Sequence, residues 1–130
     1  MSKPLGIRCA IAAAGALGGA VMLAQTGGAI AAAPPPPSFA HCAVCHATTT
    51  AAPKKLGPTL AGVAGKPAAT RPGYAYSAAL KGSKIVWTDA KLDAFLTKPS
   101  QVVPGTKMAF GGMRDAAARA QVIAFIKTLR

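Results

Sequence analysis

The stretch FAHCAVCHATTT (residues 39–50) places two cysteines and two histidines between His41 and His46. The chain has one further cysteine, Cys9, and no further histidine. A Cys-x-x-Cys pair is compatible with a disulfide, a metal site or covalent attachment of a cofactor through both thiols. The fold of this chain depends on which of these chemistries applies.

Three interpretations of the pair are weak. A disulfide between Cys42 and Cys45 would close too small a loop to stabilise a fold much through chain entropy. A thioredoxin-like redox pair requires a strand–helix–strand setting, and the sequence shows no convincing strand pattern. A zinc site is a further alternative, but His41 is adjacent to Cys42, so that the four side chains can hardly complete one tetrahedron.

The pattern Cys42-x-x-Cys45-His46 is the signature of c-type haem attachment. In such a site the two thiols bond covalently to the haem vinyl groups and the histidine binds the iron. The spacing places both sulfurs on one helical turn, with the histidine directly after it. We therefore predict one covalent haem c.

The N-terminus has the order of a secretory signal. Lys3 and Arg8 precede an apolar run rich in alanine and glycine, which ends in small residues before a proline run. We expect residues 1–31 to be cleaved off, which implies a periplasmic protein. The alternative is an uncleaved membrane anchor, since residues 10–33 are long enough to cross a bilayer, although alanine and glycine partition weakly into hydrocarbon.

Two further segments follow the signal, a Pro-rich arm (residues 32–38) and a single domain (residues 39–130). The formal net charge of +12 falls only to +10 without the signal, because Lys3 and Arg8 are its only charged residues. A surface this basic favours acidic partners. Nucleic acid is not expected, because the chain is exported and its lysines are scattered. Membrane contact is expected only if the signal is retained.

The sequence predicts few helices. Residues 39–47 allow one or two helical turns. Thr88 is expected to cap a helix that ends before Pro99 and places Leu92, Phe95 and Leu96 on one face. Asp115 is expected to cap the last helix, with Arg119 and Lys127 facing away from its apolar side. The apolar side of that last helix is formed by Ala118, Val122, Phe125, Ile126 and Leu129.

Long loops separate these helices. Residues 46–76 and 99–114 contain proline and glycine with no sustained period, which predicts loop. A loop of about 30 residues is unusual in a compact domain unless it wraps something that supplies its core. The chain also has few large apolar side chains, so a bound staple is expected. We predict an all-α fold with three main helices and long loops around one covalent haem.

The second axial ligand of the iron decides the function. Methionine suits electron transfer, whereas an open position admits small molecules or peroxide. The candidates are Met108, Met113 and His41. His41 precedes the attachment cysteine and is expected to be exposed, and Met113 is expected to pack against the last helix. Met108 lies in a turn-forced loop far from His46 in sequence.

The chain resembles the class I cytochromes c over residues 39–130. The resemblance rests on motifs in the family's order: CAVCH (42–46), GPTLAG (57–62), PGYAYSAAL (72–80), IVWTDAKLDAFL (85–96), VPGTKMAF (103–110) and the C-terminal amphipathic helix.

The resemblance implies which residues hold the cofactor. Cys42 and Cys45 carry the haem, and His46 and Met108 bind the iron. Pro58 accepts a hydrogen bond from the His46 ring through its carbonyl group, which fixes the tautomer.

Four more site residues follow from the resemblance. Tyr76 and Trp87 are similar to the residues that hydrogen-bond the haem propionates, and Tyr74 lines the same edge. Thr106 stands beside the methionine ligand. Without the resemblance, Trp87 would be interpreted as an ordinary core residue.

The chain also departs from the family pattern. Phe95 replaces a common tyrosine and Leu80 a common asparagine, which removes two hydrogen-bond partners from the haem pocket. Lys66 stands where an arginine often supports a propionate, and an ammonium cannot reproduce the fork of a guanidinium. The N-terminal helix is reduced to at most two turns, so Phe39 is expected to take over part of its packing.

These features predict a monomeric periplasmic one-electron carrier and not an enzyme. A basic ring around the haem edge is expected to meet acidic surfaces on a reductase, an oxidase or a photosynthetic reaction centre. The candidate residues for this ring are Lys54, Lys55, Lys81, Lys84, Lys98 and Lys107.

The alternatives are a haem protein with a labile sixth ligand, peroxidase-like or gas-binding, and a haem subunit of a dehydrogenase. Leu80 and Phe95 favour a looser methionine loop, but no distal histidine or arginine stands out for acid–base chemistry. A haemless zinc domain is the remaining alternative.

Overall fold

The computed structural model describes residues 33–130, so the predicted signal and its cleavage point lie outside the described residues. One 3-10 helix, η1 (Pro37–Phe39), precedes five α-helices. These are α1 (Ala40–Cys45), α2 (Ala78–Gly82), α3 (Asp89–Thr97), α4 (Pro99–Val102) and α5 (Ala116–Thr128). Within this part of the chain, strand pairing is limited to one isolated antiparallel bridge between Pro67 and Val86. The all-α class is confirmed.

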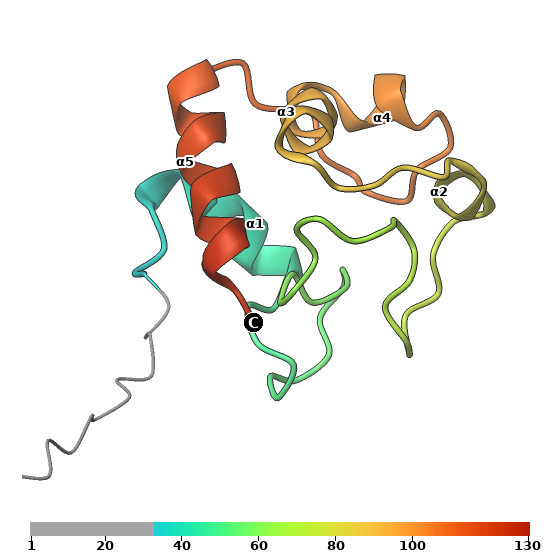
Figure 1. The fold of residues 1–130 in the computed structure, drawn as a ribbon, viewed down its shortest axis with the longest axis horizontal. Coiled ribbons are helices and arrows are strands. Elements are labelled where there is room, and N and C mark those ends of the chain that lie inside the picture. The colour runs from blue at the N-terminus through green and yellow to red at the C-terminus, as the bar shows by residue number, and fades with distance from the viewer. Residues whose placement is uncertain (1–32) are drawn as a thin grey trace, which may run out of the picture.

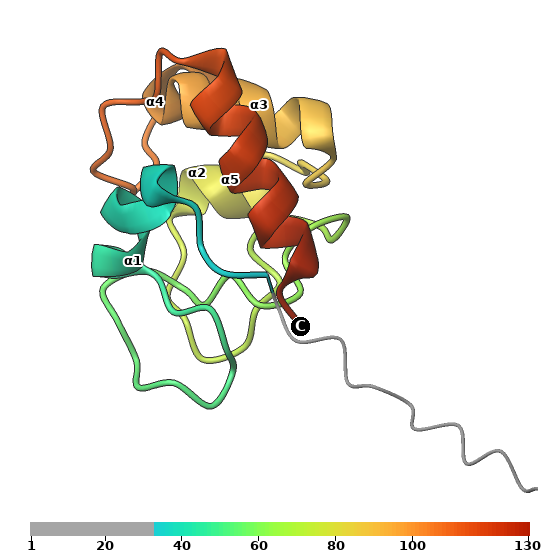
Figure 2. The same cartoon turned by 90° about the vertical axis from the view of Figure 1, so that its left-hand side faces the viewer.

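Helix α5 packs against elements from two distant parts of the described chain. It contacts both η1 and α3, and the chain between α1 and α2 forms a large looped region beyond its C-terminal end (Figures 1 and 2). Between residues 33 and 130, no helix is both long enough and apolar enough to cross a bilayer.

The short N-terminal helices are anchored by one aromatic contact. Phe39 is 1% exposed, and its ring packs edge-on against Phe125 of α5 with 4.7 Å between the ring centroids. A proline at the start of η1 costs no hydrogen bond, because the first backbone N–H groups of a helix have no partner within it. Phe39 therefore takes over packing as the sequence predicts.

The two longer helices begin at the predicted caps. The Thr88 hydroxyl oxygen accepts a hydrogen bond from the Lys91 N–H at 3.3 Å. Asp115 Oδ1 accepts from the N–H groups of Ala117 and Ala118 at 2.8 and 3.1 Å. Both side chains satisfy donors that the first helical turn leaves unpaired. The predicted apolar face of α3 is buried as expected.

The prediction that Arg119 faces away from the packed side of α5 is wrong. Its side chain is only 11% exposed, and its Nε donates to Asp93 Oδ1 of α3 at 2.7 Å. Its Nη1 also donates to the carbonyl groups of Met113 and Arg114 at 2.8 and 3.0 Å. The guanidinium joins α3, α5 and the connecting loop because its planar fork serves several acceptors at once.

The sequence did not predict the two shortest α-helices. Helix α2 is capped by Ser77, whose hydroxyl oxygen accepts from the Leu80 N–H at 3.1 Å. Helix α4 falls within the segment predicted as loop, and Pro99 begins it as well as ending α3. Helices of four or five residues are too short to show a helical period in the sequence.

The long loop between α1 and α2 is tied to the helices by scattered backbone hydrogen bonds. The Gly62 N–H donates to the Leu129 carbonyl at 3.0 Å, and the Ala68 N–H donates to Ile85 at 2.7 Å. In this loop Ala69 has a φ of 61°, in the left-handed region that residues with a Cβ rarely adopt.

We expect Ala69→Gly to raise the free energy of unfolding by about 1 kcal/mol, because glycine removes the left-handed penalty. The same change at the exposed helical residue Ala94 is the matched control, and it should lower the free energy by about 1 kcal/mol. Guanidinium unfolding of both variants tests this. A loss of stability in both would show that the conformation of Ala69 costs nothing.

Candidate functional site

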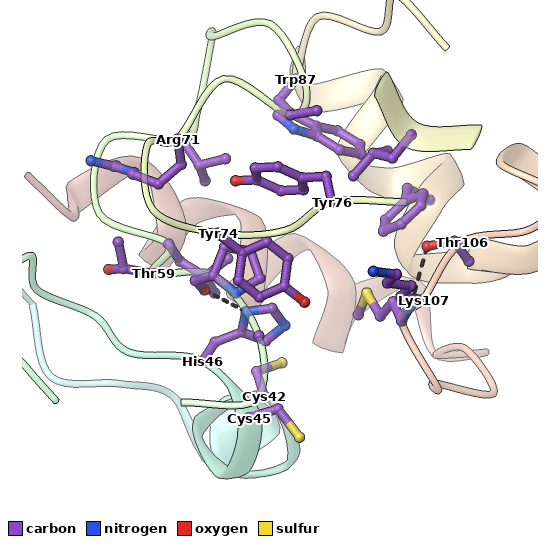
Figure 3. A pocket seen from close by; sticks show the side chains of 18 of the residues that line it. Cys42, Cys45, His46, Thr59, Arg71, Tyr74, Tyr76, Trp87, Thr106 and Lys107 are labelled. Atoms are coloured by element: carbon purple, nitrogen blue, oxygen red, sulfur yellow. Dashed lines mark hydrogen bonds between the residues drawn. The ribbon is translucent and has the colours of Figure 1, made fainter. Parts of the chain in front are cut away.

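A cavity of about 440 Å³ lies between the long loop, α3 and the loop that precedes α5. Its wall is largely apolar. The structure brings every site residue predicted from the sequence to this one cavity (Figure 3). They are Cys42, Cys45, His46, Pro58, Tyr74, Tyr76, Trp87, Thr106 and Met108.

Helix α1 presents both thiols at one side of the cavity. Cys42 and Cys45 are half-buried and not joined in a disulfide. Burial raises the pKa of the Cys42 thiol, against a smaller opposite effect of a backbone hydrogen bond. Within residues 33–130, no three His, Cys, Asp or Glu side chains are grouped to hold a metal ion. The ligand set of the zinc alternative is therefore not assembled in this part of the chain.

His46 follows α1 directly and is held in one orientation. Its Nδ1 lies 2.8 Å from the Pro58 carbonyl oxygen. Because a carbonyl only accepts, Nδ1 carries the proton and Nε2 keeps the lone pair that a metal requires. Burial lowers the pKa of the imidazole, as does the charge of Lys55, while the bond to Pro58 opposes them. The neutral form of the imidazole is favoured.

Gly57 makes room for this ring. A Cβ at position 57 would stand 2.5 Å from His46 Cε1 and 2.7 Å from Nδ1, closer than such atoms can approach. The Gly57 N–H also donates to the Cys45 carbonyl at 2.8 Å. The glycine thus allows the loop to close over the imidazole and hold it.

The loop that carries Met108 forms another part of the wall. Figure 3 places Thr106 and Lys107 across the cavity from His46. The Met108 N–H donates to the Thr106 hydroxyl oxygen at 3.2 Å, and its carbonyl accepts from Phe110 at 2.9 Å. These two short-range bonds fix the backbone on both sides of the half-buried methionine.

The other two candidates for a second ligand, Met113 and His41, do not lie across the cavity from His46. Met113 packs against the hydrophobic core, and its N–H donates to the Leu96 carbonyl at 2.8 Å. His41 is exposed and lies beside Cys42 on α1, at the rim of the cavity. His41 therefore belongs to the same side of the cavity as His46.

Aromatic side chains cover a further part of the wall. The rings of Tyr74 and Tyr76 pack edge-on at 4.8 Å, and those of Trp87 and Phe95 pack edge-on at 4.9 Å. The Tyr74 hydroxyl donates to the Leu56 carbonyl at 3.2 Å. Burial raises the pKa of the Tyr76 phenol, with a smaller opposite effect from its neighbour Arg71.

Sequence reasoning missed Arg71, which is half-buried and lines the same cavity. A basic residue in a loop carries no periodic pattern. The only sequence feature that points to Arg71 is the small number of acidic residues. With three acidic residues in the whole chain, most of the basic residues cannot form an ion pair within the protein.

The chain is similar to several known cytochromes. It is 44% identical to cytochrome c2 of Rhodomicrobium vannielii over 90 residues, which cover 69% of this chain and 72% of that protein. It is 46% identical to cytochrome c of Euglena viridis over 86 residues, or 66% and 83% of the two chains. The solved structure of cytochrome cH from Methylobacterium extorquens aligns with a TM-score of 0.66 at 42% identity, covering 70% of this chain and 91% of that one. No family model matches the chain.

We expect Gly57→Ala to destabilise the protein by about 2 kcal/mol or more, because the added methyl group overlaps the His46 ring. Gly82→Ala is the matched control, since a Cβ there would meet no atom within 4 Å. Denaturant unfolding of both variants gives the comparison. Equal stability of the two would mean that the loop closes over His46 without needing a glycine.

Proposed function

The chain belongs to the class I cytochromes c, and on that premise we propose that it is an exported carrier that moves one electron at a time between redox partners. Proteins of this family are electron carriers with a covalent haem c.

The observation that carries the proposal is the convergence of the site residues on one cavity. Residues from the helix at 40–45, from the long loop and from the loop before α5 reach the same largely apolar space. Cys42 and Cys45 supply the thiols for attachment. His46 Nε2 and the Met108 sulfur would bind the iron. When bound, the haem supplies an iron centre that accepts and releases one electron.

The chemistry of these residues fits the group. Both thiols are unbonded, and the imidazole is oriented by Pro58 at 2.8 Å in its neutral form. A methionine ligand together with a histidine would raise the reduction potential of the iron, as suits electron transfer. With both residues bound to the iron, little room would remain for peroxide or a gas ligand.

The proposed location of the protein rests on its N-terminal secretory signal. Residues 1–31 have the features of a cleavable secretory signal. Cleavage releases a monomeric domain outside the cytoplasm, where c-type attachment and exchange with membrane or soluble redox complexes take place.

The surface beside α1 suits brief contact with acidic partners. Val44, between the two cysteines, is 75% exposed, and Leu56 is 81% exposed. Lys54 and Lys55 precede Leu56 directly and are exposed. A small apolar patch beside positive charges gives fast association steered by charge and weak enough for rapid release. We propose acidic surfaces of a reductase, an oxidase or a reaction centre as its partners.

We expect Met108→Ala to abolish the near-infrared absorption band of methionine on ferric iron and to let the reduced haem bind carbon monoxide. Met113→Ala is the matched control and should retain the band, because Met113 packs on the core. Absorption spectra of both loaded proteins make the test. The assignment of Met108 fails if the band survives in its variant or disappears only in the control.

Charge reversal at Lys54 should slow electron transfer to an acidic partner by about tenfold at low salt, with the difference fading at high salt. Lys91→Glu on α3 changes the net charge equally, and Lys91 is also exposed. Stopped-flow rates at several salt concentrations compare the two. Equal slowing by both would indicate that only the net charge steers the encounter.

A further inference from the structure

Arg71 is a cationic residue in the wall of the cavity. Its side chain is half-buried and lines the cavity. Its Nη2 lies 3.6 Å from the point where a Cβ on Gly62 would stand, so the guanidinium lies over this glycine. Figure 3 shows Arg71 and Tyr76 together on one side of the cavity. The local backbone supports this position, because Ala69 and Gly73 flank Arg71 with φ values of 61° and 76° that turn the loop sharply.

No acidic side chain of this protein is available to pair with Arg71. The chain contains three acidic residues in all. Asp89 pairs with Lys127 at 2.6 Å and Asp93 with Arg119 at 2.7 Å. Asp115 caps α5. A nearby anion stabilises a half-buried guanidinium, and none of the three acidic side chains supplies one.

We propose that Arg71 binds a carboxylate of the haem propionates and thereby replaces the arginine that the family often has at the position of Lys66. This inference rests on the proposed function, since it requires the haem to occupy the cavity. A guanidinium can hold a carboxylate through two parallel hydrogen bonds, which the single ammonium of a lysine cannot. Lys66 is exposed and Arg71 is half-buried, so the better-placed and better-shaped donor is Arg71.

The pairing has a measurable effect on the iron. A guanidinium keeps the bound carboxylate ionised to lower pH and adds a positive charge near the metal. Its loss should lower the midpoint potential and make the potential fall as pH rises, because the carboxylate then ionises within the measured range. The other titratable groups on this side of the cavity are Tyr74, Tyr76 and Lys66. His46 and His41 lie on the α1 side and are unchanged in every variant.

The test is the midpoint potential of the haem-loaded protein between about pH 5 and about pH 9, a range above the usual pKa of a carboxylic acid. We compare Arg71→Gln with Lys66→Gln, which removes the same charge. Arg71→Gln should lower the potential and give it a slope with pH that the wild type lacks. Lys66→Gln should leave the slope unchanged, and adding Lys66→Arg to Arg71→Gln should restore part of the wild-type profile.

An unchanged profile in Arg71→Gln, or the new slope in Lys66→Gln alone, would overturn the inference. If Arg71→Gln does not load haem, Arg71→Lys retains the charge without the fork and should show a smaller change of the same sign, whereas a wild-type profile there would also overturn it. The reduced spectrum of the wild type distinguishes a failure of the proposed function from a failure of this inference. Absence of haem from the wild type contradicts the proposed function, while a loaded but unaffected Arg71 variant contradicts only this inference.

Discussion

The hydrogen bond between His46 Nδ1 and the Pro58 carbonyl, at 2.8 Å, is the contact on which the rest of the site depends. It ties the long loop to α1, sets the ring tautomer and leaves Nε2 free to bind a metal. The same corner requires a glycine at position 57, because the backbone passes too close to the imidazole for any side chain. This one hydrogen bond thus holds the imidazole at the end of α1 against the long loop.

The loop beyond Pro58 has almost no regular structure and is positioned by its ends and by what it encloses. Its backbone meets the rest of the fold at Gly62, bonded to Leu129, and at Ala68, bonded to Ile85. Beyond Ala68 the loop presents Arg71, Tyr74 and Tyr76 to the cavity. A loop of such length is unusual in a small domain unless it wraps a bound group. Haem attachment therefore accounts for both the cavity and the shortage of helices.

Much of this site could be predicted from the sequence, because its chemistry is local or tied to a motif. The pattern at residues 42–46 indicated the cofactor, and the caps Thr88 and Asp115 located the two longer helices. The role of Arg119 could not be predicted, because its partner Asp93 belongs to another helix and only packing brings them within 2.7 Å. Arg71 was missed for a similar reason, since its significance appears only once the acidic residues are seen to be engaged elsewhere.

The short helices α2 and α4 could not be predicted for a different reason, which is their length. Each is set by one local feature, the Ser77 cap or a proline at the first position, and neither is long enough to give a period. The substitutions in the haem pocket are easier to interpret in space than in sequence. Phe95 packs its ring edge-on against Trp87 at 4.9 Å, and it lines the cavity without offering a hydroxyl group there.

If the chain folds around a covalent haem, amide hydrogen exchange should differ between the protein produced with haem and the protein produced without it. We expect the N–H groups of Gly57, Leu60 and Ala68, which donate across the long loop, to be protected only in the haem-loaded protein. Equal protection of these amides without haem would contradict this expectation, because the loop would then be held by the polypeptide alone.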